Sequence, residues 1–488
     1  MNPSPCTDLN RSASELSRAI HARELSCREL MQATLQQVQR LNPHHVALVN
    51  VADAEHLLLQ ADAHDAMLAR GHSLGWMHGL PFAAKDTAHA AGFPTTQGTP
   101  LFKDALATQD STTIARMKAA GGICIAKTNM PEFGLGSHTY NPLFGATRNA
   151  WDDRVSAGGS SGGAAVALAL RMLPLADGSD FMGSLRNPAG WANVFGMRPS
   201  QGRVPNWPKP ELFVSQLGTD GPMARTVQDL ARLLTTQAGQ DLRAPLSIAQ
   251  APGQDFVPAT GASVKGLRIG WLGDLGGHLA TEPGIISGLE VALARCQGAG
   301  AHVEPTALGF DHDRLWQAWL LWRRALVAPS VAAALKSPAD RAHIKPEALW
   351  EYDQAQGLLN TDFMQAAQVR SAFYSHMLGL FERFDLLALP TVQLWPFALE
   401  TTWPRQIGSR TMDTYHRWME CTIHATFAGL PAISVPAGFD ATGRWPLGLQ
   451  LIGPPQGDAA LLRAAAGYEQ LAGDWLGQVP HSAGLLGR

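Results

Sequence analysis

The amino-acid sequence predicts an α/β fold, and three features of the chain lead to that prediction. Between residues 75 and 240, short β-prone runs such as GLPFAAKD and GGICIAKTN alternate with glycine-rich turns and helical stretches, one of them at Ser111 to Ala120. This alternation is typical of strand–helix–strand packing. Strand-like runs return near the C-terminus in FDLLALPT and PAISVPAGF, so we expect distant segments to complete the sheet. Hydrophobic residues make up 45% of the chain, which is ample material for a large core.

The chain begins with a helical region, for which we expect the bounds 12–70. Apolar residues recur at helical spacing between residues 12 and 41. Ser26 followed by Glu29 has the spacing of a capping box, in which two side chains satisfy free amides at the start of a helix. We therefore expect two consecutive helices before the alternating region at 75–240.

The C-terminal half is expected to be rich in helices. Residues 240–265 are rich in Ala, Pro, Gly and Gln, which indicates a surface connection. After it, GLRIGWLGD predicts a strand, Ser287 to Gln297 a helix, and residues 311–384 a mostly helical segment. We assign about 300–420 to a helix-rich region and 421–488 to the part that completes the sheet.

Three tryptophans of the helix-rich region recur at helical spacing. Trp316, Trp319 and Trp322 fall on one side of the expected helix. An apolar stripe of this kind is more typical of a helix face that packs into the core than of a ligand pocket. We therefore expect these side chains to be core residues.

Charge and cysteine usage exclude several classes of protein. The 38 basic and 41 acidic residues give a formal charge of -3, which creates no field to attract nucleic acid or an anionic membrane. The five cysteines are scattered without CxxC spacing, which argues against a disulfide framework or a structural zinc site. The N-terminus shows no signal-like segment, and no run approaches the roughly 20 apolar residues of a membrane span. We expect a cytoplasmic protein with small neutral partners, no metal and no cofactor.

The stretch SAGGSSGG at residues 156–163 leads into an apolar helical run and admits three interpretations. A phosphate-binding P-loop needs a lysine directly after its last glycine, but alanine follows Gly163. A nucleophile elbow of the form GxSxG fits around Ser160, but it requires a buried strand just before it, and RNAWDDRVSA does not predict one. The third interpretation uses two other segments. LADGSDFMGSLRNPA presents Ser184 in a second loop of small residues, and GLPFAAKD places Lys85 at the end of an apolar run.

These three segments, together with others in the same order, resemble the amidase signature family. The other segments are AKTNMPEFGLGSHTYNPLFGATRNAWD, GTDGPMARTVQDLA, and the tail GLPAISVPAGFD followed by PLGLQLIGPP. The resemblance extends over about residues 12–465. It implies a single large domain over 1–488, with a central mixed, twisted sheet flanked by helices and a helix-rich substrate-specificity region in the C-terminal half. The variant SDFMGSLRNP, with QLWPF and MDTYHRWME, also resembles the subgroup that contains the 6-aminohexanoate cyclic-dimer hydrolases.

The resemblance implies a Ser-cisSer-Lys triad made of Ser184, Ser160 and Lys85. In the family, the first serine attacks an amide carbonyl, the second relays the proton, and the lysine receives it. The peptide before the relay serine is cis, and Gly159 makes this geometry sterically easier because it carries no side chain. Ser161 and the glycines after it are then expected to begin a helix.

The lysine of such a triad acts as a base only when it is neutral, whereas its unperturbed pKa is about 10.4. The apolar run before Lys85 predicts burial, which lowers a lysine pKa. The carboxylate of the neighbouring Asp86 would oppose this effect. Because adjacent residues on a strand face opposite sides, we expect Asp86 to point away from the amine of Lys85.

The resemblance also implies an oxyanion site made of backbone amides just before the nucleophile. These are the amides of Phe181, Met182, Gly183 and Ser184. The loop departs from the common form Thr-Asp-Thr-Gly-Gly-Ser, because Met182 replaces the first glycine. The backbone N–H remains, so we expect oxyanion binding to persist if the local φ suits a residue with a side chain.

Four further residues match family positions around the site. Asp180 and Arg186 flank the nucleophile loop and are expected to hold it through hydrogen bonds. Gly134 and Gly136, in PEFGLGSH, correspond to a segment that lines the acyl side of the cleft, although a plain turn explains them equally well.

The resulting hypothesis is an amidase that hydrolyses a small, fairly apolar linear, aryl or cyclic amide, or a related carbamate or ester, through an acyl-enzyme. Two alternatives stay open. One is the amidase-like subunit of a tRNA-dependent amidotransferase, and the other is a catalytically weak binding protein in which Met182 compromises the oxyanion loop. Since family members are often dimers, the resemblance also implies a homodimer.

Overall fold

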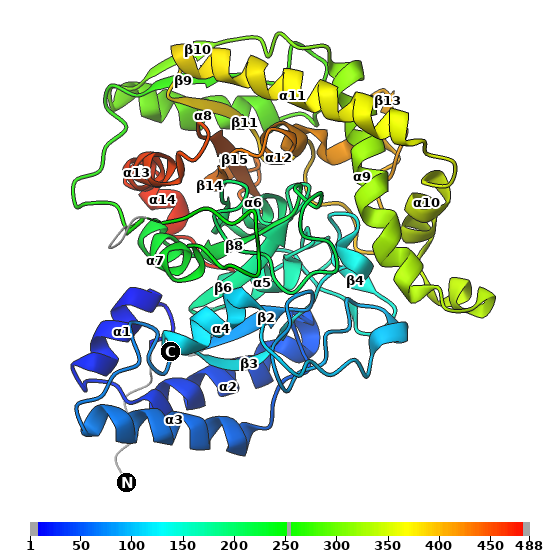
Figure 1. Cartoon of the computed structure of the whole chain (residues 1–488). Coiled ribbons are helices and arrows are strands. Elements are labelled where there is room, and N and C mark those ends of the chain that lie inside the picture. The colour runs from blue at the N-terminus through cyan, green and yellow to red at the C-terminus, as the bar shows by residue number, and fades with distance from the viewer. Residues whose placement is uncertain (1–7, 251–254, 482–488) are drawn as a thin grey trace.

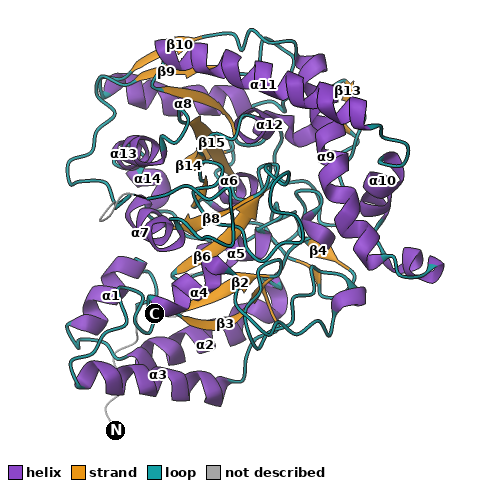
Figure 2. Ribbon diagram, in the orientation of Figure 1, coloured by secondary structure: helices purple, strands orange, loops and turns teal. Residues whose placement is uncertain are grey.

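The computed structural model describes residues 8–250 and 255–481. Its centre is a twisted, mixed sheet of eight strands with helices packed on both sides (Figures 1 and 2), which confirms the α/β prediction. The strand order is β10-β9-β11-β15-β14-β7-β8-β6. In that order the strands are His302–Pro305, Arg268–Trp271, Leu386–Pro390, Pro446–Ile452, Ala432–Phe439, Phe195–Arg198, Thr219–Ala224 and Leu175–Asp180.

The order of the strands shows how distant parts of the chain complete the sheet. β9 pairs in parallel with β10 and β11, and the remaining neighbours are antiparallel. β14 and β15, from the C-terminal part, lie between β11 and β7 and join the two halves. Because both faces of the sheet are covered, these strands are almost entirely apolar and buried.

The runs GLPFAAKD and GGICIAKTN form strands, but these lie outside the eight-stranded sheet. They are β2 (Pro81–Lys85) and β3 (Ile123–Thr128), which pair in parallel and form a small sheet with β1 (Leu48–Val49). β2 lies against β6 of the large sheet. At the end of β2, the backbone N–H of Lys85 donates to a side chain of β6, the carboxylate of Asp177.

Three helices at the bottom of the view in Figure 1 share a hydrophobic core with the small sheet. They are α1 (Ala13–His21), α2 (Cys27–His45) and α3 (Ala54–Ala69). The capping box at Ser26 and Glu29 is confirmed, since each side chain accepts from the backbone N–H of the other residue.

The helix-rich part of the C-terminal half forms one side of the molecule (Figure 1) and contains α9 (His312–Ala334), α10 (Pro346–Gln354) and α11 (Asn360–Arg383). α9 packs against both α10 and α11. The tryptophans of α9 are buried core residues, as predicted; they are Trp316, Trp319 and Trp322.

The remaining elements connect and cover these parts. The other α-helices are α4 (Thr112–Ala119), α5 (Gly162–Ala169), α6 (Arg186–Ala192), α7 (Val227–Gln237), α8 (Ile285–Gly298), α12 (Ile423–Phe427), α13 (Asp458–Glu469) and α14 (Gly473–Leu476). The short 3-10 helices are η1 (Pro100–Phe102), η2 (Glu132–Gly134), η3 (Pro338–His343) and η4 (Arg417–Thr422). Two small hairpins pair β4 (Tyr140–Asn141) with β5 (Gly145–Ala146), and β12 (Gln406–Ile407) with β13 (Arg410–Thr411).

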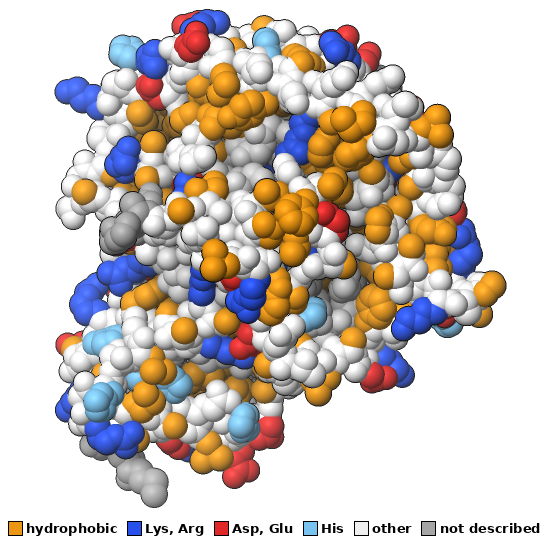
Figure 3. Space-filling view, viewed as in Figure 1, with side chains coloured by type: hydrophobic (Ala, Val, Ile, Leu, Met, Phe, Trp, Pro, Cys, Tyr) orange, Lys and Arg blue, Asp and Glu red, His pale blue; other side chains and the backbone are white. Residues whose placement is uncertain are grey.

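Several bulk predictions can be compared with the described residues. Positive and negative side chains are intermixed on the face shown in Figure 3. The described cysteines, Cys27, Cys124, Cys296 and Cys421, are free and buried, whereas Cys6 lies outside the described residues. Within residues 8–250 and 255–481, no helix is long and apolar enough to cross a membrane. The same ranges contain no cluster of three or more His, Cys, Asp or Glu residues suited to a metal ion.

Candidate active site

The amine of Lys85 lies at the centre of a buried cluster of hydroxyl groups. Its Nζ is 2.8 Å from Oγ of Ser160, 2.9 Å from Oγ of Ser161 and 3.0 Å from Oγ of Ser179. The residue is 1% exposed, so these oxygens replace the water that would otherwise solvate the amine. All three are neutral, and a neutral amine can bond with them as well as an ammonium can.

Burial lowers the pKa of Lys85 to about 8, against the opposing pull of the carboxylates of Asp177, Asp220 and Asp180. The predicted direction is therefore confirmed. Asp86 is also turned away as expected. Its carboxylate accepts from the backbone N–H and the hydroxyl of Thr96 and lies 3.9 Å from Nζ of Lys127.

The glycine-serine loop places Ser160 beside Lys85. Its glycines lie so close to neighbouring segments that they leave no room for side chains at their positions. The Gly159–Ser160 peptide is cis. A Cβ on Gly162 would lie 2.3 Å from Oγ1 of Thr139, so the close approach of these segments requires glycine. α5 begins at Gly162 with Ser161 as its N-cap residue. The segment before the loop, residues 149–160, contains isolated bridges and no strand, which excludes the elbow interpretation.

The second serine loop follows directly from the end of β6. The carboxylate of Asp180 accepts from the backbone N–H of Gly183 at 2.8 Å and from Nη2 of Arg186 at 2.9 Å. The carbonyl oxygen of Ser184 accepts from the backbone N–H of Ser161 at 3.1 Å. These contacts tie the two serine loops together and orient Ser184 relative to Ser160.

Asp180 and Arg186 form a fully buried ion pair under the loop. Although burial alone would raise the pKa of the Asp180 carboxyl, the guanidinium groups of Arg186 and Arg198 hold it well below its usual range. Arg186 also donates to the carbonyl oxygen of Thr422 and to Oγ1 of Thr426. The pair therefore joins the nucleophile loop to the C-terminal part of the chain, which agrees with the predicted holding role.

The hydrogen bonds narrow the set of oxyanion donors. The N–H of Gly183 is already bonded to Asp180, whereas those of Phe181, Met182 and Ser184 have no acceptor among the residues that the structure describes. Met182 is not among the residues of positive φ, so its backbone accommodates a side chain. The donors that remain for an oxyanion are therefore the amides of Phe181, Met182 and Ser184.

Ser160 and Ser184 open into one cavity of about 630 Å³. Gly134 and Gly136 line it too, with φ of +71° and +76°. A Cβ on Gly134 would be 3.7 Å from Oγ of Ser160. Both glycines thus line the site; Gly134 ends the 3-10 helix η2 and Gly136 lies in a bend.

The walls of this cavity differ in polarity. One set of lining residues is apolar: Phe133, Leu135, Phe181, Met182, Leu326, Val327, Pro329 and Met419. Another set is polar or charged: His89, Gln97, Ser111, Asn206, Lys209, Glu211, Thr219, Asp220 and Arg323. No motif in the sequence pointed to Arg323, Asp220 or Asp177 as site residues. The only signal for Asp177 was an acidic residue in the otherwise apolar run LADG.

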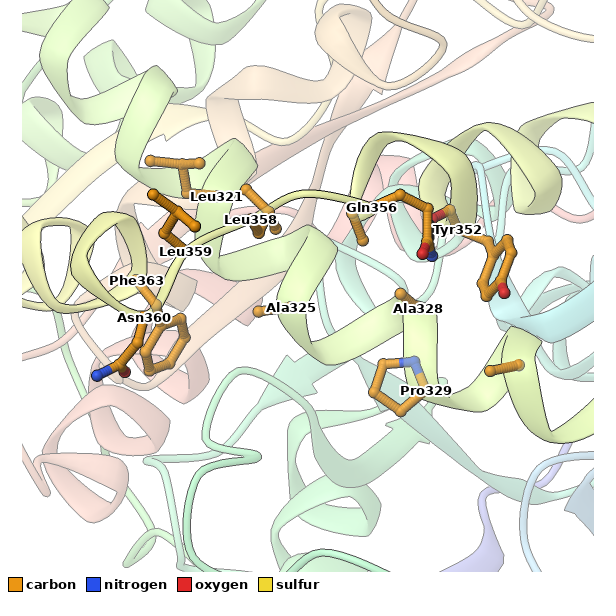
Figure 4. A pocket seen from close by; sticks show the side chains of 12 residues that line it. Leu321, Ala325, Ala328, Pro329, Tyr352, Gln356, Leu358, Leu359, Asn360 and Phe363 are labelled. Carbon is orange, nitrogen blue, oxygen red and sulfur yellow. Dashed lines mark hydrogen bonds between the residues drawn. The ribbon is translucent and has the colours of Figure 1, made fainter.

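A second cavity of about 400 Å³ lies between α9, α10 and α11 (Figure 4). Ala325 and Pro329 line both cavities, so α9 is the wall between them. The second cavity is lined mainly by alanine, leucine and aromatic side chains and contains none of the motif residues. The candidate active site is therefore the cavity at the two serine loops.

Comparison with known proteins agrees with this geometry. The profile of the amidase family matches residues 29–462. The acylamidase of Rhodococcus erythropolis is 33% identical to this chain over 94% of each protein. The chain belongs to the amidase signature family. It is accordingly an amide-hydrolysing enzyme, and the resemblance seen in its motifs is confirmed.

Other amidase signature proteins show how broad the family is. The A subunit of the glutamyl-tRNA(Gln) amidotransferase of Chromohalobacter salexigens is 31% identical, over 96% of this chain and 97% of that protein. A solved bacterial aryl acylamidase superposes with a TM-score of 0.88 at 30% identity, covering 96% and 97% of the two chains. The 6-aminohexanoate cyclic dimer hydrolase in complex with substrate superposes with a TM-score of 0.84 at 26% identity, covering 98% and 100%.

Proposed function

We propose that this amidase hydrolyses a small, fairly apolar linear, aryl or cyclic amide, or a related carbamate or ester, through an acyl-enzyme on Ser184. The observation that carries the proposal is the 2.8 Å contact between Nζ of buried Lys85 and Oγ of Ser160, at the wall of the cavity that Ser184 also lines. The apolar set of lining residues supports an apolar substrate.

In the proposed reaction, neutral Lys85 takes the hydroxyl proton of Ser160 while Ser160 takes that of Ser184. Oγ of Ser184 then bonds to the amide carbon, and the carbonyl oxygen becomes negative. The free amides of Phe181, Met182 and Ser184 are placed to stabilise that charge. The carbon–nitrogen bond breaks as the proton returns through Ser160 to the leaving amine. Water then cleaves the ester by the reverse sequence and frees the acid and Ser184.

This chemistry requires a lysine of lowered pKa. A general base works best when its pKa is near the operating pH, and burial brings the pKa of Lys85 to about 8. A lysine at its ordinary pKa would be almost entirely protonated at pH 7 and could not accept the proton.

The test is active-site labelling followed by turnover. A fluorophosphonate is expected to modify Ser184, and peptide mapping identifies the adduct. Lys85→Met should slow labelling by about 10²–10⁴-fold because it removes the base, while Lys118→Met, at a partly exposed ion pair with Asp110, should leave it unchanged. Labelling of another residue, or equal labelling in Lys85→Met, would reject the mechanism.

The two alternatives are decided by a wider assay of the same preparation. A panel of aliphatic, aryl and cyclic amides identifies the substrate class of a stand-alone hydrolase. Ammonia release that depends on glutamine and on a co-purifying partner would identify an amidotransferase subunit instead. Labelling of Ser184 without turnover of any amide would identify a weak binding protein.

We also propose, from the sequence, that the enzyme is a cytoplasmic homodimer that acts on small molecules and binds neither nucleic acid nor membranes. Light scattering after size-exclusion chromatography measures the mass in solution. A mass near that of one 52.3 kDa chain would reject the dimer.

A further inference from the structure

Arg323 of α9 lies in the wall of the candidate active-site cavity, beside the nucleophile loop. It lines the cavity together with Phe181 and Met182, yet the residue is only 2% exposed. Its guanidinium carbon lies 5.4 Å from the centre of the Phe181 ring, and its Nη1 is 4.0 Å from Sδ of Met182. A cation is therefore held next to the two residues that precede Gly183 and Ser184.

Hydrogen bonds to two neighbouring side chains set the orientation of this guanidinium. Nε donates to Oε1 of Glu351 at 2.5 Å, and Nη2 donates to the phenolic oxygen of Tyr415 at 2.6 Å. The hydroxyl of Tyr415 in turn donates to the same Oε1 of Glu351 at 2.7 Å. All three residues are buried, so the arrangement is rigid. Because Nε and Nη2 of the planar guanidinium are both hydrogen-bonded, Nη1 has little freedom to turn away from Met182.

One nitrogen of the Arg323 guanidinium, Nη1, has no strong hydrogen-bond acceptor. A guanidinium has five N–H donors, and here the strong acceptors bond to Nε and Nη2. The acceptor of Nη1 is the thioether of Met182, which is weak. A buried donor without a good acceptor is costly, and a substrate oxygen in the cavity would remove that cost.

We propose that Arg323 determines specificity by donating from Nη1 to a second oxygen acceptor of the substrate, distinct from the scissile carbonyl. This inference rests on the proposed function and narrows its substrate class. Because Glu351 compensates the charge of Arg323 at 2.5 Å, the acceptor is a neutral carbonyl oxygen, as in a second amide, a ketone or an ester. The preferred substrate is thus an apolar amide that carries one further carbonyl group.

The experiment compares matched substrates in matched enzymes. One series of anilides carries a keto group at successive positions of the acyl chain, and a second series carries it on the amine side. Each compound has a hydrocarbon partner of equal length. For the best-placed ketone, the wild-type ratio of kcat/KM, ketone over hydrocarbon, is expected to be about tenfold or more, as for a hydrogen bond to a charged donor.

The enzyme variants are Arg323→Met, the double variant Arg323→Met with Glu351→Met, and the control Arg324→Met. The double variant avoids leaving the carboxylate of Glu351 buried without its partner. Arg324 is the next residue of α9, but its guanidinium lies over the ring of Trp350 at 5.1 Å and does not line the cavity. The ketone preference should fall to about onefold in both Arg323 variants and persist in Arg324→Met.

Loss of folding lowers kcat/KM for the ketone and for its hydrocarbon partner alike, whereas loss of the substrate contact changes the ratio of the two values. The inference is overturned if neither series shows a ketone preference in the wild-type enzyme. It is also overturned if the preference survives in an Arg323 variant that still hydrolyses the hydrocarbon anilide. Failure of the proposed function looks different, because then no anilide is hydrolysed and Ser184 is not labelled.

Discussion

The backbone N–H of Lys85 donates to the carboxylate of Asp177, with 3.0 Å between the nitrogen and Oδ1. Both residues are buried. Burial, reinforced by the nearby carboxylate of Asp220, raises the pKa of Asp177 to about 7, while Lys127 and Lys85 pull it down. The base of the proposed triad thus has an acidic neighbour that titrates close to neutral pH.

This contact makes a prediction about pH. Activity should rise with pH as Lys85 loses its proton, near its pKa of about 8. The charge of Asp177 raises that pKa, so Asp177→Asn should lower it and move the rising limb of kcat/KM to lower pH. The asparagine oxygen can still accept from the N–H of Lys85. The pH profile of amide hydrolysis measures the shift.

Asp86→Asn is the matched control, because its carboxylate is buried next to Lys85 in sequence but faces Thr96. The rising limb of kcat/KM in Asp86→Asn should lie at the same pH as in the wild-type enzyme. A limb that stays in place in Asp177→Asn, or moves to higher pH, would show that this carboxylate does not tune the lysine.

Two of the three hydroxyls bonded to Lys85, those of Ser160 and Ser161, should differ in importance. Ser160 lines the cavity and is the proposed relay, so Ser160→Ala should lower kcat by about 10²–10⁴-fold. Ser161 bonds to Lys85 at 2.9 Å but serves as the N-cap residue of α5. Ser161→Ala leaves Lys85 its hydrogen bonds to Ser160 and Ser179 and should cost only about tenfold. Single-turnover acylation distinguishes them, and equal losses would contradict the relay role of Ser160.

Gly183 should tolerate no side chain. Its φ is +82°, and a Cβ would lie 2.7 Å from Oδ1 of Asn187 and 2.7 Å from Cγ2 of Thr422. Gly183→Ala should displace the neighbouring amides and lower kcat by about 10²-fold. Gly443, with φ of +72° and nothing within 4 Å of the methyl group that alanine would add, is the control for backbone strain alone.

Gly443→Ala should cost about 1 kcal/mol of unfolding free energy and leave kcat unchanged. Urea titration and steady-state kinetics measure the two effects. Full activity in Gly183→Ala would mean that the loop path is not what positions the oxyanion donors.

The buried pair of Asp180 and Arg186 should matter for stability as well as for activity. Arg186→Leu leaves the carboxylate of Asp180 buried beside Arg198 alone and should cost about 3–5 kcal/mol of unfolding free energy. Arg268→Ala, at an exposed pair with Asp385, should have little effect because water screens such pairs. Denaturant unfolding compares the variants. A loss in Arg186→Leu no larger than in Arg268→Ala would contradict the role of the pair.

Local sequence patterns predicted much of this enzyme correctly. The capping box at Ser26 and Glu29, the helix that starts after Ser161, and the strand that ends at Lys85 depend on residues a few positions apart, and each is present. The family motifs also led to the cavity, because Ser160 and Ser184 line it. Burial of Lys85 followed from the apolar run before it, and the direction of its pKa shift followed from burial.

What the sequence determined by itself was the set of reactive side chains and the local backbone that carries them. The tertiary structure alone decided which distant groups surround them. Asp177 reaches the N–H of Lys85 because β2 and β6 meet, and Arg323 reaches the cavity because α9 packs beside the nucleophile loop. Charge and hydrogen bonding act through space, so partners 92 or 141 positions apart leave no periodic pattern along the chain.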